Sequence, residues 1–408
     1  MNSGEIFALA LGLQSPWEIK EISFKKTDAC KELHISIDFK RGSKFPDSKG
    51  QACEVYDTKQ KTWRHLNFFE HSCYLHCRVP RIRTSDGKTH LIDVPWARAG
   101  SGFTLLFEAY VMSLIENEMP MNKIAALTKV DAHRLWTIFN YWINQAYDAD
   151  DPKDITQLGI DETSQRRGHK YVTIGVDLER RKVIHATKGK DAKTLEKMRD
   201  YLVSKGIDPE QIAHASIDLS PSFISGLKKY FPKAEIHFDR FHVKKLLNEA
   251  MDDVRKLERK EHKELKGYKY IFLKNNENLT DKRRASLNEL ITLFPTLGEA
   301  YRLKELFDDV WDMETKEEAS SFLDMWIADV NTHKIAPFMK FARTVRAHQS
   351  GIINFVKTRI NNGILEGINS KVQLAKRRAR GYRNIDNLIN MIYFLCGKLK
   401  FDYPLNSS

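Results

Sequence analysis

The hydrophobic pattern of the first hundred residues is an alternation of apolar and polar positions in short stretches, broken by glycine and proline. Alternation with a period of two is typical of strands that bury one face. It is clearest over residues 34–39, 63–74 and 77–82. We therefore expect residues 1–100 to form a small β-rich module.

Residues 101–150 show a helical period instead, because apolar residues recur there every three or four positions. Residues 121–130 predict a short amphipathic helix that ends in a turn. Asp131 can cap a second helix over residues 132–146, since a short polar side chain at that place accepts a bond from the first turn. We expect a helix-turn-helix in this region.

In a helix-turn-helix, the second helix enters the major groove of DNA. His133 and Arg134 stand at the start of that helix and favour a DNA-binding role. A three-helix bundle without any DNA contact would show the same apolar spacing. The pattern therefore favours DNA binding by this region and leaves the bundle open.

An acidic linker over residues 148–152 precedes a unit of mixed strands and helices. Strands are expected at residues 158–160, 171–176, 182–187, 212–217 and 234–238, with helices at residues 194–205 and 222–230. Three strands, a helix, a strand, a helix and a strand is the order of the ribonuclease H-like fold, which has an α/β mixed sheet. We assign residues 151–242 to the first part of such a domain.

Residues 243–355 contain long charged amphipathic patterns and no convincing strand, so we expect an all-helical insertion there. Residues 356–408 would return to the ribonuclease H-like domain as two helices. The second helix, over residues 384–399, is strongly apolar and is expected to pack on the sheet. The expected fold is thus an α/β ribonuclease H-like domain with a long helical insertion, preceded by the β-rich module and the helix-turn-helix.

Composition narrows the class of protein. With 408 residues, 42% apolar and 29% charged, the chain is neither wholly disordered nor fibrous. Its five cysteines are too sparse and too odd in number for a disulfide framework, which fits a reducing compartment and predicts a cytoplasmic protein. The apolar run at residues 6–13 is short and follows an acidic residue, so we expect neither a signal peptide nor a membrane span.

Net charge indicates a polyanionic partner. The chain carries 66 Lys and Arg against 54 Asp and Glu, a net charge of +12. The excess is clustered in residues 371–383, which hold six basic residues and no acid; clustered positive charge is the main source of affinity for nucleic acid. The residues expected to hold phosphates are Lys371, Lys376, Arg377, Arg378, Arg380 and Arg383.

Three carboxylates are candidates for chemistry. Asp161 and Asp218 fall at or near the ends of expected strands, and Glu366 lies on an expected helix; in a ribonuclease H-like sheet these places converge. Three carboxylates at one point repel one another, and divalent metal relieves the repulsion. Hard oxygen ligands suit Mg²⁺, and two such ions ~4 Å apart would clamp a phosphoryl displacement. Phosphodiester cleavage and strand transfer are the reaction implied.

Each carboxylate has a simpler interpretation, because an isolated Asp at a strand end is more often a turn residue and Glu366 alone would be a surface residue. The sequence that flanks these carboxylates favours a metal-binding site. Near the same face of the helix as Glu366 fall four polar residues that we expect to meet a DNA backbone: Asn369, Gln373, Lys376 and Arg377.

These residues carry a resemblance to a known family. The chain resembles the DDE transposases of bacterial insertion sequences, specifically the family named after insertion sequence L three. The matching stretches are residues 63–69, 94–98, 101–108, 159–163, 238–243, 365–371 and 379–383.

The resemblance implies Asp161 as the first catalytic and metal-binding aspartate, Asp218 as the second and Glu366 as the glutamate. Residues 239–242 look like the Asp-x-x-His signature of related groups, so Asp239 and His242 are expected to be supporting residues. Asp239 is the runner-up for the second carboxylate.

The family usually begins with a zinc finger, but residues 45–50 and 83–87 stand where its cysteines would be. Cys73, His76 and Cys77 lie close in sequence, yet alternation would point the two thiols to one face and the imidazole to the other. Zinc is therefore not expected in this module, and buried thiols are favoured.

The function expected from the sequence is that of a transposase. It would bind the terminal inverted repeats of its insertion sequence and catalyse cleavage and strand transfer with two Mg²⁺ ions, for which Mn²⁺ could substitute. Its partners would be double-stranded DNA of the element ends and the target, and a second copy of itself, as a homodimer or a larger synaptic assembly. Two alternatives stay open: a structure-selective nuclease, and a catalytically inactive DNA-binding protein derived from a transposase.

Overall fold

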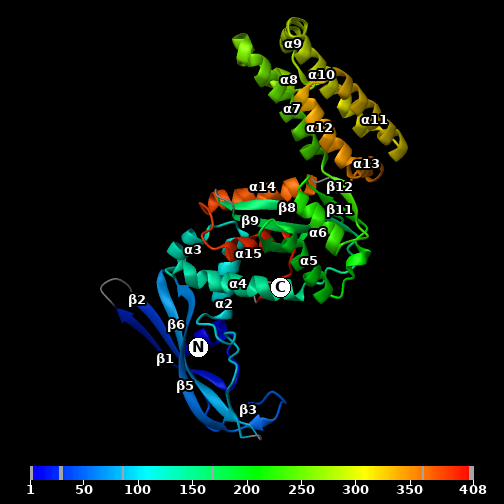
Figure 1. Cartoon of the computed structure of the whole chain (residues 1–408). Helices are drawn as coiled ribbons and strands as arrows, with labels where there is room; N and C mark the ends of the chain where they lie inside the picture. The colour runs from blue at the N-terminus through cyan, green and yellow to red at the C-terminus, as the bar shows by residue number, and fades with distance from the viewer. Residues whose placement is uncertain (1–2, 27–30, 85–86, 167–169, 361–362, 404–408) are drawn as a thin grey trace. The chain divides into compact units, whose positions relative to one another are not determined.

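The computed structural model describes residues 3–26, 31–84, 87–166, 170–360 and 363–403. The chain divides into two compact units (Figure 1). The first comprises Met1–Ala149 with Leu399–Ser408, and the second comprises Asp150–Lys398.

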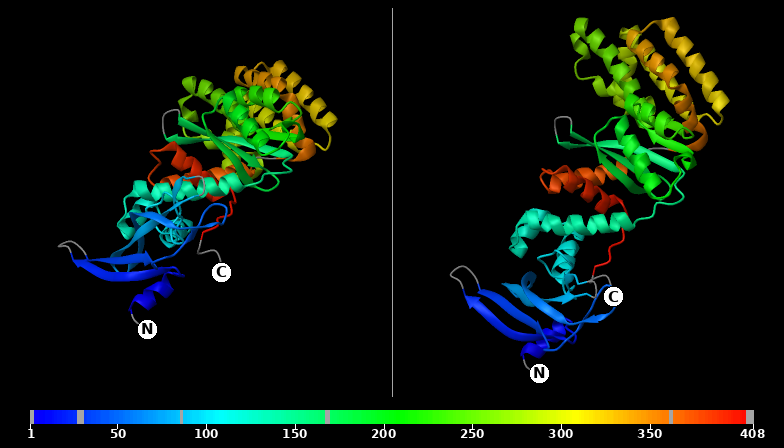
Figure 2. Two further views of the ribbon diagram at one scale, coloured as in Figure 1. Left: turned by 90° about the horizontal axis from the view of Figure 1, so that it is seen from below. Right: turned by 60° about the horizontal axis from the view of Figure 1, so that its bottom comes forward.

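The first unit begins with a short helix, α1 (Ser3–Ala10), and a twisted five-stranded sheet, drawn in blue to cyan in Figure 2. The strand order is β1-β2-β6-β5, with β7 paired to β6; β2 and β6 are parallel and the other pairs antiparallel. Alternate residues of β2 and β6 are buried, which is the pattern expected for one covered face. The strands of this sheet are β1 (Trp17–Lys26), β2 (Lys31–Phe39), β5 (Val55–Phe68), β6 (His71–Arg83) and β7 (Thr89–Leu91). β3 (Phe45–Pro46) and β4 (Ala52–Cys53) form a separate antiparallel pair.

The single strand expected over residues 63–74 is wrong. The chain reverses at Phe69 and Glu70, where Phe69 has a φ of 52°, so this stretch ends β5 and starts β6. A tight turn hardly interrupts the alternation of apolar and polar residues, and the pattern therefore did not reveal the reversal.

Three helices follow the sheet: α2 (Leu105–Glu116), α3 (Met121–Thr128) and α4 (Ala132–Ala149). Asp131 caps α4 as expected, because its Oδ1 accepts the backbone N–H of His133 at 2.8 Å. The helix continues to Ala149, so the acidic stretch expected as a linker begins inside α4.

A buried carboxylate fixes α2 to α4 within this unit. Glu108 is fully buried and accepts hydrogen bonds from Arg98 at 2.9 Å, Ser101 at 2.6 Å and the indole N–H of Trp142 at 2.9 Å. Burying a charged group is costly unless such partners surround it. This network therefore holds α4 in one orientation against α2.

The second unit contains a five-stranded sheet of order β10-β9-β8-β11-β12. β8, β9 and β10 are antiparallel neighbours, whereas β11 is parallel to both β8 and β12. The strands are β8 (Gln157–Arg166), β9 (Lys170–Asp177), β10 (Lys182–Lys188), β11 (His214–Ile217) and β12 (Glu235–Phe238).

Helices cover both faces of this sheet. α5 (Ala192–Ser204) packs where Gly175 leaves room for Met198, and α6 (Pro221–Tyr230) packs beside α5. α14 (Gly363–Arg378) packs on β8, and α15 (Ile385–Cys396) packs on β10, where the Tyr393 hydroxyl accepts the backbone N–H of Ala186 at 2.7 Å. The expected packing of the last helix on the sheet is confirmed.

Between β12 and α14 the described residues form helices and no strand, and these helices gather in one bundle drawn from green to orange (Figure 1). Trp311 and Trp326 are both fully buried in its core. The helices are α7 (Arg240–Glu261), α8 (Lys269–Leu273), α9 (Asp281–Leu293), α10 (Pro295–Phe307), α11 (Lys316–His333), α12 (Ala336–Ala347) and α13 (Gln349–Thr358).

No helix among the described residues has both the length and the apolar character that a membrane crossing requires.

Candidate functional site

Three aspartates lie at one level across neighbouring strands. Ser216 of β11 is aligned with Gly159 of β8 and with His237 of β12. Two residues further along each parallel strand stand Asp161, Asp218 and Asp239. The sheet register therefore brings their carboxylates to one edge.

Asp161 lies in the middle of β8 rather than at a strand end, which corrects the expectation from the sequence. The strand continues to Arg166 because it goes on pairing with β9 after β11 has ended at Ile217. The carboxylate of Asp161 is thus held on a continuous strand beside the open end of β11.

Local hydrogen bonds orient the three side chains differently. Asp218 accepts the backbone N–H of Ser220 at 2.9 Å through Oδ1. Asp239 caps α7 by accepting the N–H of Phe241 at 3.2 Å through Oδ1, and its Oδ2 accepts His242 Nδ1–H at 2.9 Å. Both oxygens of Asp239 are therefore engaged, and Asp239 is buried.

The charges of this group act on one another. Burial raises the pKa of Asp161, and the nearby carboxylates of Asp218 and Asp239 raise it further, against the opposing effects of the Glu162 backbone N–H and of His242. The hydrogen bond to Asp239 raises the pKa of His242. Mutual repulsion of this kind indicates a place that a cation would stabilise.

The beginning of α14 lies against the same part of β8. The Leu365 side chain occupies the space above Gly159, where an added Cβ would come within 3.2 Å of Leu365 Cδ1. One turn later, Asn369 Nδ2 donates to Asp161 Oδ2 at 2.6 Å. Glu366 lies between these two contacts on the first turn of the helix and is exposed.

The structure does not gather the three expected carboxylates into a closed cluster. The carboxylate oxygens of Asp161, Asp218 and Glu366 do not all lie within 4.8 Å of one another. It does bring Asp161, Asp218, Asp239 and His242 together, with Glu366 on the helix that contacts Asp161.

Gln373 and Lys376, like Asn369, contact the sheet, which corrects the expectation that the whole polar stripe of α14 meets a DNA backbone; Arg377 is exposed. Gln373 Nε2 donates to Thr163 Oγ1 at 3.3 Å, and Lys376 Nζ donates to the Ser164 carbonyl and to Gln373 Oε1. Burial lowers the pKa of Lys376. This lysine is thus a tether between α14 and β8, whereas the remaining basic residues of this region are exposed: Lys371, Arg377, Arg378, Arg380 and Arg383.

In the first unit, His133 and Arg134 are exposed on the first turn of α4. The Arg134 guanidinium lies 4.5 Å from the centre of the Phe103 ring. This contact orients the side chain while leaving it exposed.

The β-rich module places its cysteines and histidine as alternation predicts. Cys73 and Cys77 are buried free thiols, and burial raises their pKa values to about 11 and about 12. His76 points to the other face, where its Nε2 lies 2.7 Å from His34 Nδ1 and its Nδ1 lies 2.9 Å from Thr62 Oγ1. The three side chains therefore do not converge on one point.

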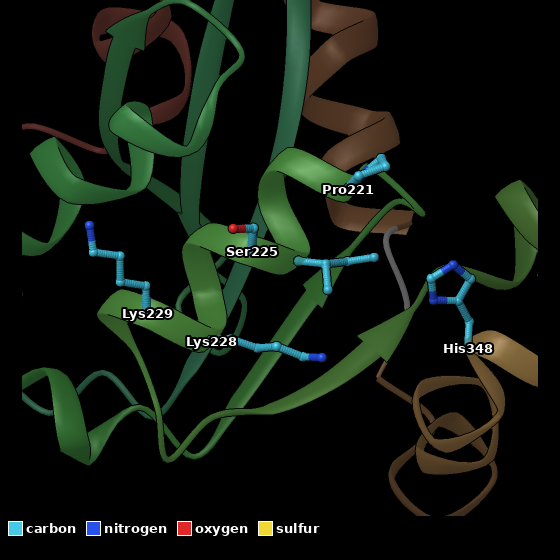
Figure 3. A pocket seen from close by; sticks show the side chains of 6 residues that line it. Pro221, Ser225, Lys228, Lys229 and His348 are labelled. Carbon is cyan, nitrogen blue, oxygen red and sulfur yellow. The ribbon is translucent and has the colours of Figure 1, made fainter.

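A surface pocket of the second unit is lined by α6 and His348, and Figure 3 shows Lys228 reaching toward His348. Burial and the charge of Lys228 lower the pKa of His348. The pocket is lined by none of the expected site residues.

The aspartate edge has the donor set of a hard-metal site. Its ligands are carboxylate oxygens, which Mg²⁺ prefers, and the charges of Asp218 and Asp239 add to the burial that raises the pKa of Asp161. Asn369 also fits such a site, because its Oδ1 is buried without a hydrogen-bond partner among the described residues. The sequence pattern placed Asn369 on the same face of the helix as Glu366, but it did not predict the hydrogen bond from Asn369 to Asp161.

Comparison with known proteins identifies the protein family. Residues 158–392 match a family model described as "Transposase", and residues 92–143 match the "Helix-turn-helix domain of transposase family ISL3". A "Transposase for insertion sequence element IS1557" of Mycobacterium tuberculosis is 26% identical over 95% of this chain and 94% of its own length. A "Transposase for insertion sequence element IS1001" of Bordetella parapertussis is 25% identical over 89% of this chain and 91% of its own length. Because the first model covers more than half of the chain, this protein belongs to the ISL3 family of DDE transposases.

Proposed function

We propose that this transposase binds the terminal inverted repeats of its insertion sequence and catalyses metal-dependent DNA cleavage and strand transfer. The observation that carries the proposal is the alignment of Asp161, Asp218 and Asp239 at one sheet edge, with α14 contacting Asp161. The names of the two relatives support the same activity.

The second unit would be a ribonuclease H-like domain in two parts, residues 151–242 and 356–408, around an all-helical insertion over residues 243–355. Its strand order and strand directions support this assignment, since the first three strands are antiparallel and the last two run parallel to the first. Residues 1–100 would be an N-terminal module, and residues 101–150 would carry the helix-turn-helix.

Asp161, Asp218 and Glu366 would hold two Mg²⁺ ions, or Mn²⁺ in their place. Bound there, the ions would activate the attacking oxygen and stabilise the leaving oxygen of the phosphodiester exchange. Glu366 would complete the site by a change of rotamer or a small shift of α14, because it is exposed and on the turn that precedes Asn369.

Asp218 is favoured over Asp239 as the second ligand. Asp218 accepts only a backbone N–H through Oδ1, whereas Asp239 caps α7 through Oδ1 and binds the His242 imidazole through Oδ2, so an ion at Asp239 would have to displace that imidazole. Asp239 and His242 would support the site by fixing the start of α7 and by placing an imidazole, whose pKa the hydrogen bond to Asp239 raises, beside the carboxylates.

DNA binding would combine two regions. His133 and Arg134 on α4 would contact the terminal repeat, in keeping with the helix-turn-helix match. The exposed basic residues of α14 and the turn after it, Lys371, Arg377, Arg378, Arg380 and Arg383, would hold phosphates near the carboxylates. Two element ends must be joined in transposition, so the working form would be a dimer or a larger synaptic assembly.

The test is cleavage of DNA that carries the flanks of the protein's own gene, with Mg²⁺ and with EDTA, by wild type and Asp161→Asn. We expect metal-dependent nicks at a repeat boundary with wild type alone. Metal-independent binding without cleavage by either protein would favour a catalytically inactive DNA-binding protein, and cleavage without preference for a repeat would favour a structure-selective nuclease.

A second experiment distinguishes the two candidates for the second ligand. A thiolate is a softer ligand than a carboxylate, so it is poorly suited to Mg²⁺ and better tolerated by a transition metal. Asp218→Cys is expected to lose cleavage with Mg²⁺ and to recover part of it with Mn²⁺. Asp239→Cys is the matched variant, and recovery by this variant instead would assign the ligand to Asp239.

A further inference from the structure

A second cluster of metal-ligand side chains lies at the other end of the same two strands. His214 is the first residue of β11, and Glu235 is the first residue of β12, directly opposite it. His237 stands two residues beyond Glu235 and therefore points to the same face of the sheet. Asp218 and Asp239 follow the opposite ends of these strands.

The three side chains offer one ligand atom each within 4.8 Å of one another. His214 Nδ1 lies 3.1 Å from His237 Nε2 and 3.9 Å from Glu235 Oε2. Two imidazole nitrogens that bind one tetrahedral Zn²⁺ at their usual bond lengths are about 3.3 Å apart. The spacing of the two nitrogens thus matches that of ligands to a single ion.

The protein holds the His237 ring in a fixed orientation and leaves the His214 ring accessible to solvent. His237 is fully buried, and its Nδ1 lies 3.2 Å from Thr358 Oγ1, which fixes the ring and directs Nε2 toward His214. Burial disfavours the charged form of an imidazole, and a metal ligand must be the neutral ring. The side chains of His214 and Glu235 are 28% and 48% exposed, which gives an ion a route from solvent.

One neighbour opposes a metal. Lys316 Nζ lies 3.5 Å from Glu235 Oε2, and its charge also acts on His237. The Lys316 side chain is 28% exposed, so an ion would have to compete with it for the carboxylate of Glu235.

The other cluster of this kind among the described residues, Glu299, Asp329 and His333, is already neutralised. The Arg302 guanidinium donates to Glu299 and, at 2.7 Å, to Asp329. A cation there would have to displace an arginine that holds two carboxylates, so the His214 cluster is the better candidate.

We propose that His214, Glu235 and His237 bind a divalent transition metal of the Zn²⁺ class, separate from the aspartate edge. Two imidazoles and one carboxylate suit such an ion and not Mg²⁺, which prefers oxygen ligands. The ion would join the first residues of β11 and β12 and so fix the register that places Asp218 beside Asp239. Its role is structural, and the inference does not depend on the proposed reaction.

The test uses Co²⁺ as a spectroscopic probe on the full chain in an Asp161→Asn background, which weakens metal binding at the aspartate edge. Tetrahedral Co²⁺ with nitrogen ligands absorbs visible light, and Zn²⁺ should displace it. We expect one equivalent bound, with affinity at least tenfold weaker in His214→Ala and in His237→Gln. His333→Ala, in the other cluster, is the matched control and should bind like the parent protein.

His237 is fully buried, so His237→Gln can fail to fold; the partly exposed His214 then carries the test alone. Lys316→Ala gives an independent readout, because removing the competing cation should strengthen Co²⁺ binding several-fold. Absence of the Co²⁺ band from the folded parent would overturn the proposal. Unchanged binding in His214→Ala, or loss of binding in His333→Ala alone, would do the same.

Discussion

Asn369 Nδ2 donates a 2.6 Å hydrogen bond to Asp161 Oδ2, joining α14 to the central strand β8 across 208 residues of sequence. Asp161 Oδ1 accepts the backbone N–H of Glu162 at 2.7 Å, so both oxygens of the aspartate have a donor. The carboxylate is thus oriented by its own strand on one side and by the helix that carries Glu366 on the other. This contact links the positions of Asp161 and Glu366.

Asn369→Ala should lower the rate of DNA cleavage by about 10–100-fold, the usual cost of removing a group that orients a metal ligand. Affinity for terminal-repeat DNA should stay unchanged, because the amide faces Asp161 and not solvent. Single-turnover cleavage and a binding titration on the same DNA measure the two effects. Ser370→Ala, at the exposed neighbouring position, is the control, and an equal loss of rate in that variant would count against a positioning role.

Asp161→Asn should stabilise the second unit while it abolishes cleavage. Burial and two neighbouring carboxylates raise the pKa of Asp161, so the folded state favours its neutral form. The neutral carboxyl of Asp161 contributes stability that is fully present below the pKa of the unfolded chain. This stability is lost as the pH rises through the pKa of Asp161 in the folded protein. At pH 7 the ionised carboxylate of Asp161 therefore destabilises the fold. In EDTA we expect the Tm to rise by about 2–4 °C, the effect of ~1 kcal/mol in a unit of this size. A lower Tm would show that the charge is already compensated without metal.

Acid should destabilise the protein in part through His185. Burial lowers its pKa to about 4 against an ordinary value of 6.5, and the ring stacks on Tyr201. Below pH 6.5 the unfolded chain binds a proton that the folded chain does not, so stability falls until pH reaches about 4, by up to about 1.4 kcal/mol per pH unit. His185→Phe should flatten this part of the pH profile, as measured by urea unfolding. His90→Gln, at an exposed position, is the control.

The double variant Arg377→Ala/Arg380→Ala should weaken binding to any duplex DNA and reduce its salt dependence. The slope of log K against log salt should become shallower by about 0.9 for each phosphate that the protein no longer neutralises. Arg134→Ala should instead weaken binding to the terminal repeat more than to unrelated DNA, because it lies at the start of the expected recognition helix. Titrations at several salt concentrations on both DNAs separate the effects, and identical losses on the two DNAs for Arg134→Ala would remove it from specific recognition.

Local sequence patterns predicted the features that depend on interactions between residues close in sequence. The cap at Asp131, the order of strands and helices around Asp161, and the packing of the apolar last helix all follow from periodicity and turn residues. The family was recognisable from short motifs and is confirmed by the match over residues 158–392.

Contacts between residues far apart in sequence could not be predicted from these local patterns. Asp161 was expected at a strand end because the pattern gave no sign that β8 continues beyond β11 along β9. The pairing of Asn369 with Asp161, and of His214 with His237, depends on strand register and helix docking that no single segment encodes.

Cleavage of terminal-repeat DNA by Glu366→Gln tests the assignment of the metal-binding carboxylates most directly. This change removes one charge at an exposed position and keeps the size of the side chain, so the fold and the affinity for DNA should be preserved. We expect normal binding and a loss of Mg²⁺-dependent cleavage of more than about 100-fold, beyond that expected for a residue that only orients a ligand. Cleavage by Glu366→Gln at the wild-type rate would contradict the assignment of Glu366 as the third carboxylate of the site.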